Sequence, residues 1–138
     1  MNFVDLGLPS GTLWAECNVG AEKPEERGDY YKFGEAQKLE VELPTLKQIE
    51  ELIKNTKSEW CKVNGLNGRK FTSPNGNSIF LRAAGFKSGS SLHFAGHDGH
   101  YWASSSAFGL GFDSSNVNLY GYSRYRGQSV RPVKNNNQ

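Results

Sequence analysis

The sequence predicts an α+β fold built from short, twisted antiparallel strands and many loops, with one clear helix and one short helix. Apolar and polar residues alternate in short runs that Gly, Pro and Asn clusters separate, which is typical of small strands. A helical repeat of apolar residues is clear only after residue 44. The 138 residues include 16 Gly and 12% aromatic residues, a composition that suits a loop-rich globular domain. The length predicts one domain, residues 1–138.

The first forty residues predict two strands and a short helix. Val4–Leu8 alternates and ends at the turn cluster Pro9–Gly11, and an extended pattern resumes over Thr12–Cys17. Pro24–Arg27 is expected to form one helical turn, because Pro and acidic residues favour the start of a helix. The aromatic segment Tyr30–Gly34 is expected to be buried on one side.

The clear helix is predicted to start after Pro44-Thr45 and to end near residues 55–57. Thr45 can cap it, and Gln48 completes a capping box. Its apolar residues share one face: Leu46, Ile49, Leu52 and Ile53. This pattern predicts a helix that packs on the core.

Turns and strands alternate after the helix. Asn64-Gly65, Asn67-Gly68 and Ser73–Gly76 predict turns around a short strand at Arg69–Thr72, followed by a buried strand at Ser78–Leu81. Later strands are expected near His100–Ser105, Gly111–Asp113, Val117–Leu119 and Gln128–Val133. The tail at residues 135–138 is expected to fray.

Charge and cysteine content constrain the partners and the compartment only weakly. The net charge is +2, but residues 1–60 hold seven basic and twelve acidic side chains, and residues 61–138 hold nine and two. A basic half could attract nucleic acid or an acidic glycan, but scattered charges are more typical of a solvated surface. Cys17 and Cys61 could form a disulfide or stay free, and we favour free thiols. No stretch of the given sequence has the pattern of a signal peptide or of a membrane span, and we expect neither.

The last third of the chain places large side chains of unrelated chemistry on Gly-rich loops. Loops normally expose small polar residues, so exposed aromatic rings suggest a surface that contacts a ligand. Lys, Glu, Gln and Met are absent from residues 88–127, although they fill 25 of the other 98 positions. Strand propensity explains part of this gap. The remainder suggests a restriction on which residues are allowed there.

Catalysis finds little support in these residues. The spacing of His93, His97, His100 and Asp98 matches no helix-based zinc motif, so exposed loop residues are the preferred interpretation. There is no phosphate-binding loop, and Ser104–Ser106 lack a nucleophile elbow. The mixture of Tyr, Ser, Gly and His with isolated Arg is instead typical of a binding surface. We therefore expect no enzyme activity and no cofactor.

Motifs spread over nearly the whole chain resemble those of a known family. They are Val4–Ala15, Asn18–Ala21, Phe33–Glu35, Leu43–Thr45, Gly68, Pro74–Leu81, Ala83–Gly85, Tyr101-Trp102 and Ser129–Val133. Together they resemble the Fibrobacter succinogenes major paralogous domain, found in surface proteins of gut bacteria. The resemblance implies a C-type-lectin-like fold.

Within that family, the last third resembles the variable proteins of diversity-generating retroelements. In those systems a reverse transcriptase copies a template with errors at adenines, and an AAY codon changed at its adenines never encodes Lys, Glu, Gln, Met or Trp. The block Arg124–Val133 is similar to the fixed end of such templates. The resemblance implies a variable region of about residues 92–127, with Ala107 a weaker variable position. The implied variable, ligand-binding positions are His93, Phe94, His97, Asp98, His100, Phe108, Leu110, Tyr120, Tyr122, Ser123 and Arg126.

The resemblance leads to a functional hypothesis, a receptor or adhesin module with a hypervariable face. Lectin calcium motifs are absent, and Cys17 and Cys61 do not match the cysteine pair of enzymatic relatives. The expected partner is an unidentified protein or glycan on a cell surface, with no nucleic acid and no membrane span. The expected location is a cell surface or a phage virion. The alternative is a non-diversified structural or glycan-binding domain of a bacterial surface.

The hypothesis predicts where these side chains lie in the fold. The variable side chains should converge on one face and be exposed, whereas Trp102, Val117 and Val130 should point away and be buried. The strand at Val4–Leu6 should also lie near Ser129–Val133, which would bring the two termini together.

Overall fold

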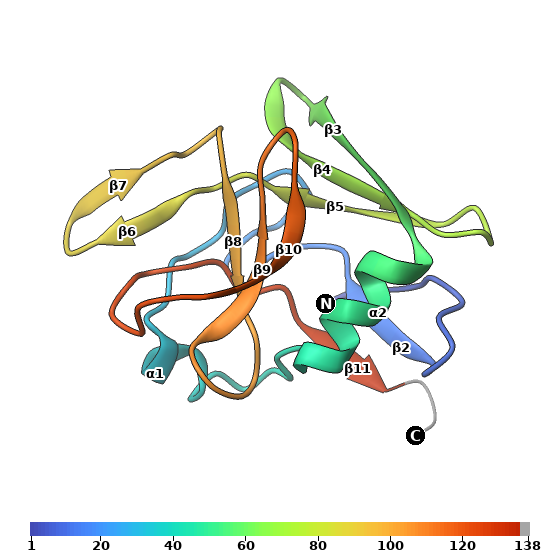
Figure 1. The fold of residues 1–138 in the computed structure, drawn as a ribbon, viewed down its shortest axis with the longest axis horizontal. Helices are drawn as coiled ribbons and strands as arrows, with labels where there is room; N and C mark the ends of the chain where they lie inside the picture. The colour runs from blue at the N-terminus through green and yellow to red at the C-terminus, as the bar shows by residue number, and fades with distance from the viewer. Residues whose placement is uncertain (136–138) are drawn as a thin grey trace.

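The computed structural model describes residues 1–135 (Figure 1). It consists of small antiparallel strands and two helices, an α+β arrangement. In chain order the elements are β1 (Phe3–Asp5), β2 (Thr12–Ala15), α1 (Phe33–Ala36), α2 (Leu46–Asn55), β3 (Lys57–Val63), β4 (Leu66–Thr72), β5 (Ser78–Arg82), β6 (Phe86–Ser88), β7 (Ser91–His93), β8 (Gly99–Trp102), β9 (Phe108–Phe112), β10 (Val117–Gly121) and β11 (Val133–Asn135). The predicted fraying of the tail concerns residues 136–138, which lie outside the described residues, and Asn135, which belongs to β11.

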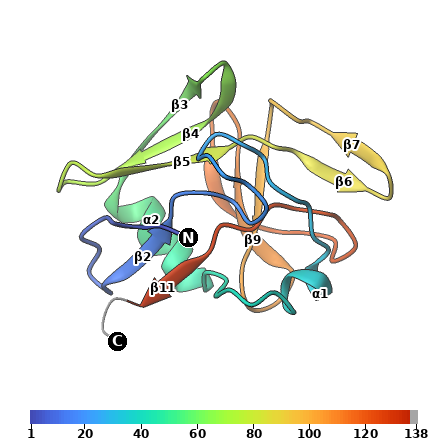
Figure 2. The same ribbon diagram turned by 180° about the vertical axis from the view of Figure 1, so that it is seen from behind.

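The first and last strands share one sheet, in the order β1-β2-β11. Trp14 of β2 pairs with Val4 on one side and with Val133 on the other, so β2 separates the two terminal strands. The expected proximity of the first and last strands is confirmed, and Figure 2 shows β2 beside β11. The expected strand at Gln128–Val133 is wrong in its bounds. Residues 127–129 make only isolated bridges, and the regular strand starts at Val133.

The sheet β3-β4-β5 is a meander of two hairpins. Asn64-Gly65 forms the predicted first turn, with φ of 49° and 80°. The predicted turn at Asn67-Gly68 is wrong, because both residues lie inside β4 and pair with β3. Gly68 packs on the backbone of Leu81 and the ring of Phe80, where a Cβ would clash. That glycine therefore allows two strands and a ring to approach closely rather than a chain reversal.

Helix α2 confirms its sequence prediction. The Thr45 side chain accepts a hydrogen bond from the Gln48 N–H at 3.1 Å, and the Gln48 side chain accepts one from the Thr45 N–H at 2.8 Å. Ile49 and Leu52 are fully buried. The short helix is displaced from its predicted place: Pro24 and Glu25 lie in a turn that the Glu26 N–H closes on the Lys23 carbonyl, and α1 forms instead at Phe33–Ala36. There the Glu35 carboxylate accepts the Lys32 N–H at 2.7 Å, a local contact that favours the helical turn.

The sheet β8-β9-β10 separates two apolar clusters. On one face Tyr101, Leu110 and Leu119 lie side by side by register and pack into the main core with α2. Trp102 lies on the other face, in a second cluster with Phe33 and Val130. The sheet is thus covered on both sides near its base.

The fully buried Arg131 connects β2, β5 and the segment after β2. The Arg131 side chain donates to Asn18 Oδ1 and to the Phe80 carbonyl, each at 2.8 Å, and to the Ala15 carbonyl at 3.2 Å. These acceptors make burial of the guanidinium tolerable.

Cys17 is buried, Cys61 is partly buried, and both are free, as we favoured.

Candidate ligand-binding face

The candidate site is built on the outer face of the β8-β9-β10 sheet. By register, His100 lies beside Gly111, and Gly109 lies between Trp102 and Tyr120. Successive strand residues point to opposite faces, so these five positions share the face away from α2. Because the central strand contributes only glycines there, rings from its neighbours can lie over it. A Cβ on Gly111 would clash with the Tyr120 ring.

A cleft of about 200 Å³ opens on this face, and we call it the central cleft. Its walls come from the loop before β8, from β8 to β10, and from the loop after β10. The lining residues are Asp98, His100, Gly111, Phe112, Asp113, Tyr120, Gly121, Tyr122 and Arg126. Five of the eleven predicted site residues therefore meet in one cleft, although 28 positions separate the first from the last.

A continuous chain of ring contacts extends the site beyond the cleft. Phe86 is its centre: its ring stacks on His93 at 5.2 Å, meets the edge of His100 at 5.4 Å and lies 6.1 Å from Phe94. Arg126 covers the same ring, with its Cζ 3.8 Å from the centroid. We call the connected rings the aromatic face; they are Phe86, His93, Phe94, His97, His100, Tyr120 and Tyr122.

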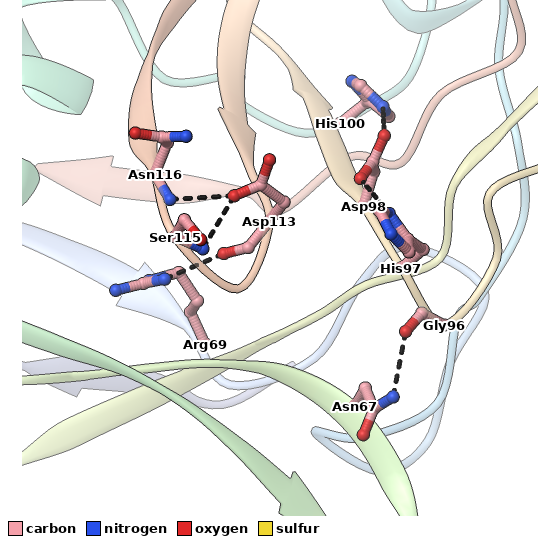
Figure 3. A network of polar contacts seen from close by, with 9 residues as sticks. All are labelled: Asn67, Arg69, Gly96, His97, Asp98, His100, Asp113, Ser115 and Asn116. Atoms are coloured by element: carbon pink, nitrogen blue, oxygen red, sulfur yellow. Dashed lines mark hydrogen bonds and ion pairs between the residues drawn. The ribbon is translucent and has the colours of Figure 1, made fainter.

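Backbone hydrogen bonds hold the loop that carries these rings. Gly85 N–H donates to the Asp98 carbonyl, and Gly96 N–H donates to the Ala83 carbonyl, both at 2.7 Å. The Asn67 side chain of β4 also donates to the Gly96 carbonyl at 2.9 Å (Figure 3). Main-chain groups make most of these bonds, so they do not depend on which side chain stands at positions 93, 94 or 97.

The β9–β10 turn is fixed in a similar way. Asp113 Oδ1 accepts the N–H groups of Ser115 and Asn116, both at 2.8 Å, and these bonds lower the pKa of Asp113 (Figure 3). Arg69 of β4 donates to the Asp113 carbonyl at 2.8 Å. One rim of the central cleft is thereby attached to the neighbouring sheet.

Asp98 lies between two histidines, as Figure 3 shows. Its Oδ1 is 2.7 Å from His97 Nδ1, and its Oδ2 is 3.7 Å from His100 Nε2, too far for a hydrogen bond. Burial lowers the pKa of His100, and Arg126 lowers it further, although Asp98 acts in the opposite sense. His100 is therefore a neutral ring at pH 7.

Polar atoms in the central cleft are left without partners. Neither ring nitrogen of His100 has a hydrogen bond, and the Tyr122 hydroxyl has none either. Burial raises the pKa of Tyr122, so the hydroxyl keeps its proton. All three atoms are themselves buried, so a ligand in the cleft could form hydrogen bonds with them only after the rings that cover them move.

The exposure of the predicted site residues divides them into groups. His93, Phe94, His97, Tyr120 and Ser123 are exposed, as expected. Asp98 and Arg126 are partly exposed at the cleft. His100 and Tyr122 are mostly covered, which corrects the expectation of substantial exposure. Each is covered by a neighbouring ring of the site itself.

Two residues of β9 do not join the face. Leu110 is only 1% exposed and belongs to the main core, so its expected exposure is wrong. Phe108 is 45% exposed, but strand alternation puts it on the same side of the sheet as Leu110. Neither side chain lines the central cleft.

The residues expected to be buried behave unequally. Trp102 and Val130 are fully buried, but Val117 is only partly buried. Trp102 also does not point away, because its ring packs perpendicular to that of Tyr122, with the two centroids 5.9 Å apart. Ala107, the weaker variable position, is partly buried beside the same cluster.

Sequence reasoning missed several members of this region, among them four residues that line the central cleft: Gly111, Phe112, Asp113 and Gly121. Phe86, the centre of the ring contacts, is 8% exposed and looked like an ordinary core residue. Leu92 is exposed next to His93. A hairpin of β6 and β7 signalled by Ser88–Ser90 could have placed both residues beside the site.

Within residues 1–135, no group of three or more His, Cys, Asp and Glu side chains is placed to hold a metal ion. The same part of the chain contains no helix that is long and apolar enough to cross a membrane. In comparisons with known proteins, no family model, curated protein or solved structure matches the chain.

Proposed function

We propose that the chain is a ligand-binding module of the receptor or adhesin type, with a hypervariable face on a C-type-lectin-like scaffold. The observation that carries the proposal is the convergence of Asp98, His100, Tyr120, Tyr122 and Arg126 in the central cleft. All five belong to the variable positions that the resemblance implies. A single surface is what a diversified binding site requires, because one ligand must contact residues from several segments.

The way the loop is anchored supports tolerance of variation. Main-chain bonds to Asp98 and Gly96 hold the segment, so exchanging the exposed rings removes few contacts on which folding depends. Exposed aromatic rings also supply contact area at low entropic cost. In a purely structural surface domain, the same exposed rings would have no role that explains their presence.

Phe94 gives independent support. Its φ is 57°, in the left-handed region that Gly and Asn enter more easily than a bulky residue. A template that encodes Asn at this position would suit the backbone, and Phe would be one of its substitutes. Diversification by a retroelement accounts for a strained aromatic residue at an exposed loop position.

The proposal extends to activity and location. The chain acts by binding, not by catalysis, and needs no cofactor. It is displayed on a bacterial surface or on a phage virion, and its partner is a protein or glycan of a cell surface. A template repeat and a reverse-transcriptase gene beside the coding region would support diversification. Their absence would favour the non-diversified surface domain.

Two matched libraries on a display platform test binding by this face. The first randomises six positions of the proposed site: His93, Phe94, His97, Asp98, Tyr120 and Ser123. The control randomises six exposed positions on α2 and β3: Lys47, Glu50, Lys54, Lys57, Glu59 and Lys62. Both are screened for protease resistance, to count folded members, and then selected against the same panel of bacterial surface proteins and glycans.

The first library should keep most of its members folded and yield specific binders more often than the control. Equal yields from the two libraries would remove the case for a dedicated face. Widespread loss of folding in the first library would show that these side chains stabilise the domain and are not free to vary.

A further inference from the structure

A second hollow lies on another side of the molecule, between α1 and the loop after β10. In Figures 1 and 2 this loop passes between α1 and the β6-β7 hairpin. Phe33 N–H donates to the Arg124 carbonyl at 3.1 Å, and Lys87 and Gly127 exchange two backbone bonds of 2.8 Å. Loop, helix and hairpin are thus joined through their main chains.

The hollow has two parts, of about 460 and 160 Å³, which meet at Lys32, Glu35 and Tyr125. We call the two together the basic groove. It shares no lining residue with the central cleft. Its main side chains are Lys32, Lys38, Lys87, Arg124, Glu35 and Tyr125.

Charge in the basic groove is unbalanced. Four cationic side chains face one carboxylate, that of Glu35, which already accepts the Lys32 N–H at 2.7 Å. Among residues 1–135 no Lys or Arg side chain lies within 4.0 Å of a carboxylate oxygen, and only His97 and His100 approach one, that of Asp98. The four cations therefore have no carboxylate partner and create a positive potential that favours an anion.

One aromatic ring in the groove is open. Tyr125 is 72% exposed, whereas cations already cover the other two rings: Arg124 lies 5.5 Å from the Phe33 centroid, and Lys87 lies 5.2 Å from that of Tyr30. The groove therefore presents a single flat apolar surface surrounded by positive charge.

We propose that the basic groove binds an acidic glycan, a sugar chain that carries carboxylate or sulfate groups. The C–H face of one sugar ring stacks on Tyr125, and the acidic groups pair with Lys32, Lys38, Lys87 and Arg124. This site is independent of the proposed function of the aromatic face, since the two have separate residues.

Two other polyanions fit the groove less well. Single-stranded nucleic acid binds by stacking successive bases on several rings, and only Tyr125 is open here. An extended acidic peptide would add to a free strand edge, but the backbone groups of Tyr31, Lys87, Gly127 and Gln128 already pair with one another. A glycan needs neither feature.

Calorimetric titration of the whole chain with polygalacturonate, with heparin and with neutral galactan tests the proposal. At least one acidic glycan should bind, more weakly as salt is raised, and galactan should not. Lys38→Gln/Arg124→Gln and, separately, Tyr125→Ala should each weaken binding about tenfold. Preference for polygalacturonate or for heparin identifies carboxylate or sulfate as the recognised group, and either result supports the proposal.

Two matched controls complete the experiment. Lys47→Gln/Lys54→Gln removes the same charge from the solvent face of α2, and Tyr120→Ala removes a ring from the central cleft; both should bind the acidic glycan like the wild type. The proposal is overturned if neither acidic glycan binds, if the α2 variant loses as much affinity as the groove variant, or if Tyr125→Ala has no effect. Equal affinity for polyglutamate or oligothymidylate would also overturn it. Urea unfolding of each variant verifies that it is folded.

Discussion

Replacing Leu110 by Ala tests whether this residue of β9 belongs to the hydrophobic core. Leu110 is 1% exposed and packs in the main core beside Tyr101. Removing three buried carbons and leaving a cavity costs about 2–5 kcal/mol. A domain of this size has an unfolding free energy of about 5–15 kcal/mol, so the change should be large, with a melting temperature lower by roughly 10 °C.

Phe108→Ala is the matched control, because it lies two residues earlier on the same side of the same strand. With 45% of its surface exposed, Phe108 should contribute only about 1 kcal/mol. Urea unfolding followed by tryptophan fluorescence measures both variants. A cost below about 0.5 kcal/mol for Leu110→Ala, or an equal cost for the two, would refute the assignment of Leu110 to the core and Phe108 to the surface.

Further predictions concern local features of the chain. Phe94→Asn should raise the unfolding free energy by up to about 1 kcal/mol by relieving a φ of 57°, and a lower stability in urea would contradict this. The lowered pKa of His100, which Asp98, Arg126 and Tyr122 face, means that the unfolded state binds a proton more readily. The contribution of neutral His100 to the unfolding free energy is therefore fully present above the ordinary pKa of 6.5 and is lost as the pH drops below it. His100→Asn should make the plot of unfolding free energy against pH flatter between about pH 7 and 5. An unchanged slope would show that His100 does not contribute. Thr45→Ala should cost about 1 kcal/mol in thermal unfolding through loss of the cap on α2, and no cost would mean that its bond is replaced by water. The melting temperature should be the same with and without EDTA, and a clear decrease would reveal a stabilising metal.

Local signals predicted the parts of the fold that short-range contacts decide. The bonds between Thr45 and Gln48 lie within one turn, so the start of α2 could be predicted from a few residues. Asn64-Gly65 formed its turn for the same reason, since both residues adopt left-handed φ values without help from the rest of the chain. Asn67-Gly68 has a similar sequence but lies in β4, because packing on Leu81 outweighs its turn propensity.

Prediction of the candidate site depended on local sequence signals and on tertiary structure. Unusual side chains on the loops marked His93, His97, Tyr120 and Arg126 as candidates, because a ring exposed on a loop gains nothing for folding. Their convergence required the pairing of β8, β9 and β10 and the packing of this sheet beside the separate sheet β6-β7. Phe86 could not be recognised, since a buried Phe looks the same in sequence whether it supports a core or a surface.

The sequence by itself determined the cap of α2, the hairpin turn at Asn64-Gly65 and the alternation along each strand. Only the tertiary structure decided which face of each strand meets water. Phe108 and Leu110 follow the same alternation, but Leu110 packs in the main core and Phe108 lies where that core ends. Burial is set by what a neighbouring element covers, a property of packing between distant segments that no local pattern contains.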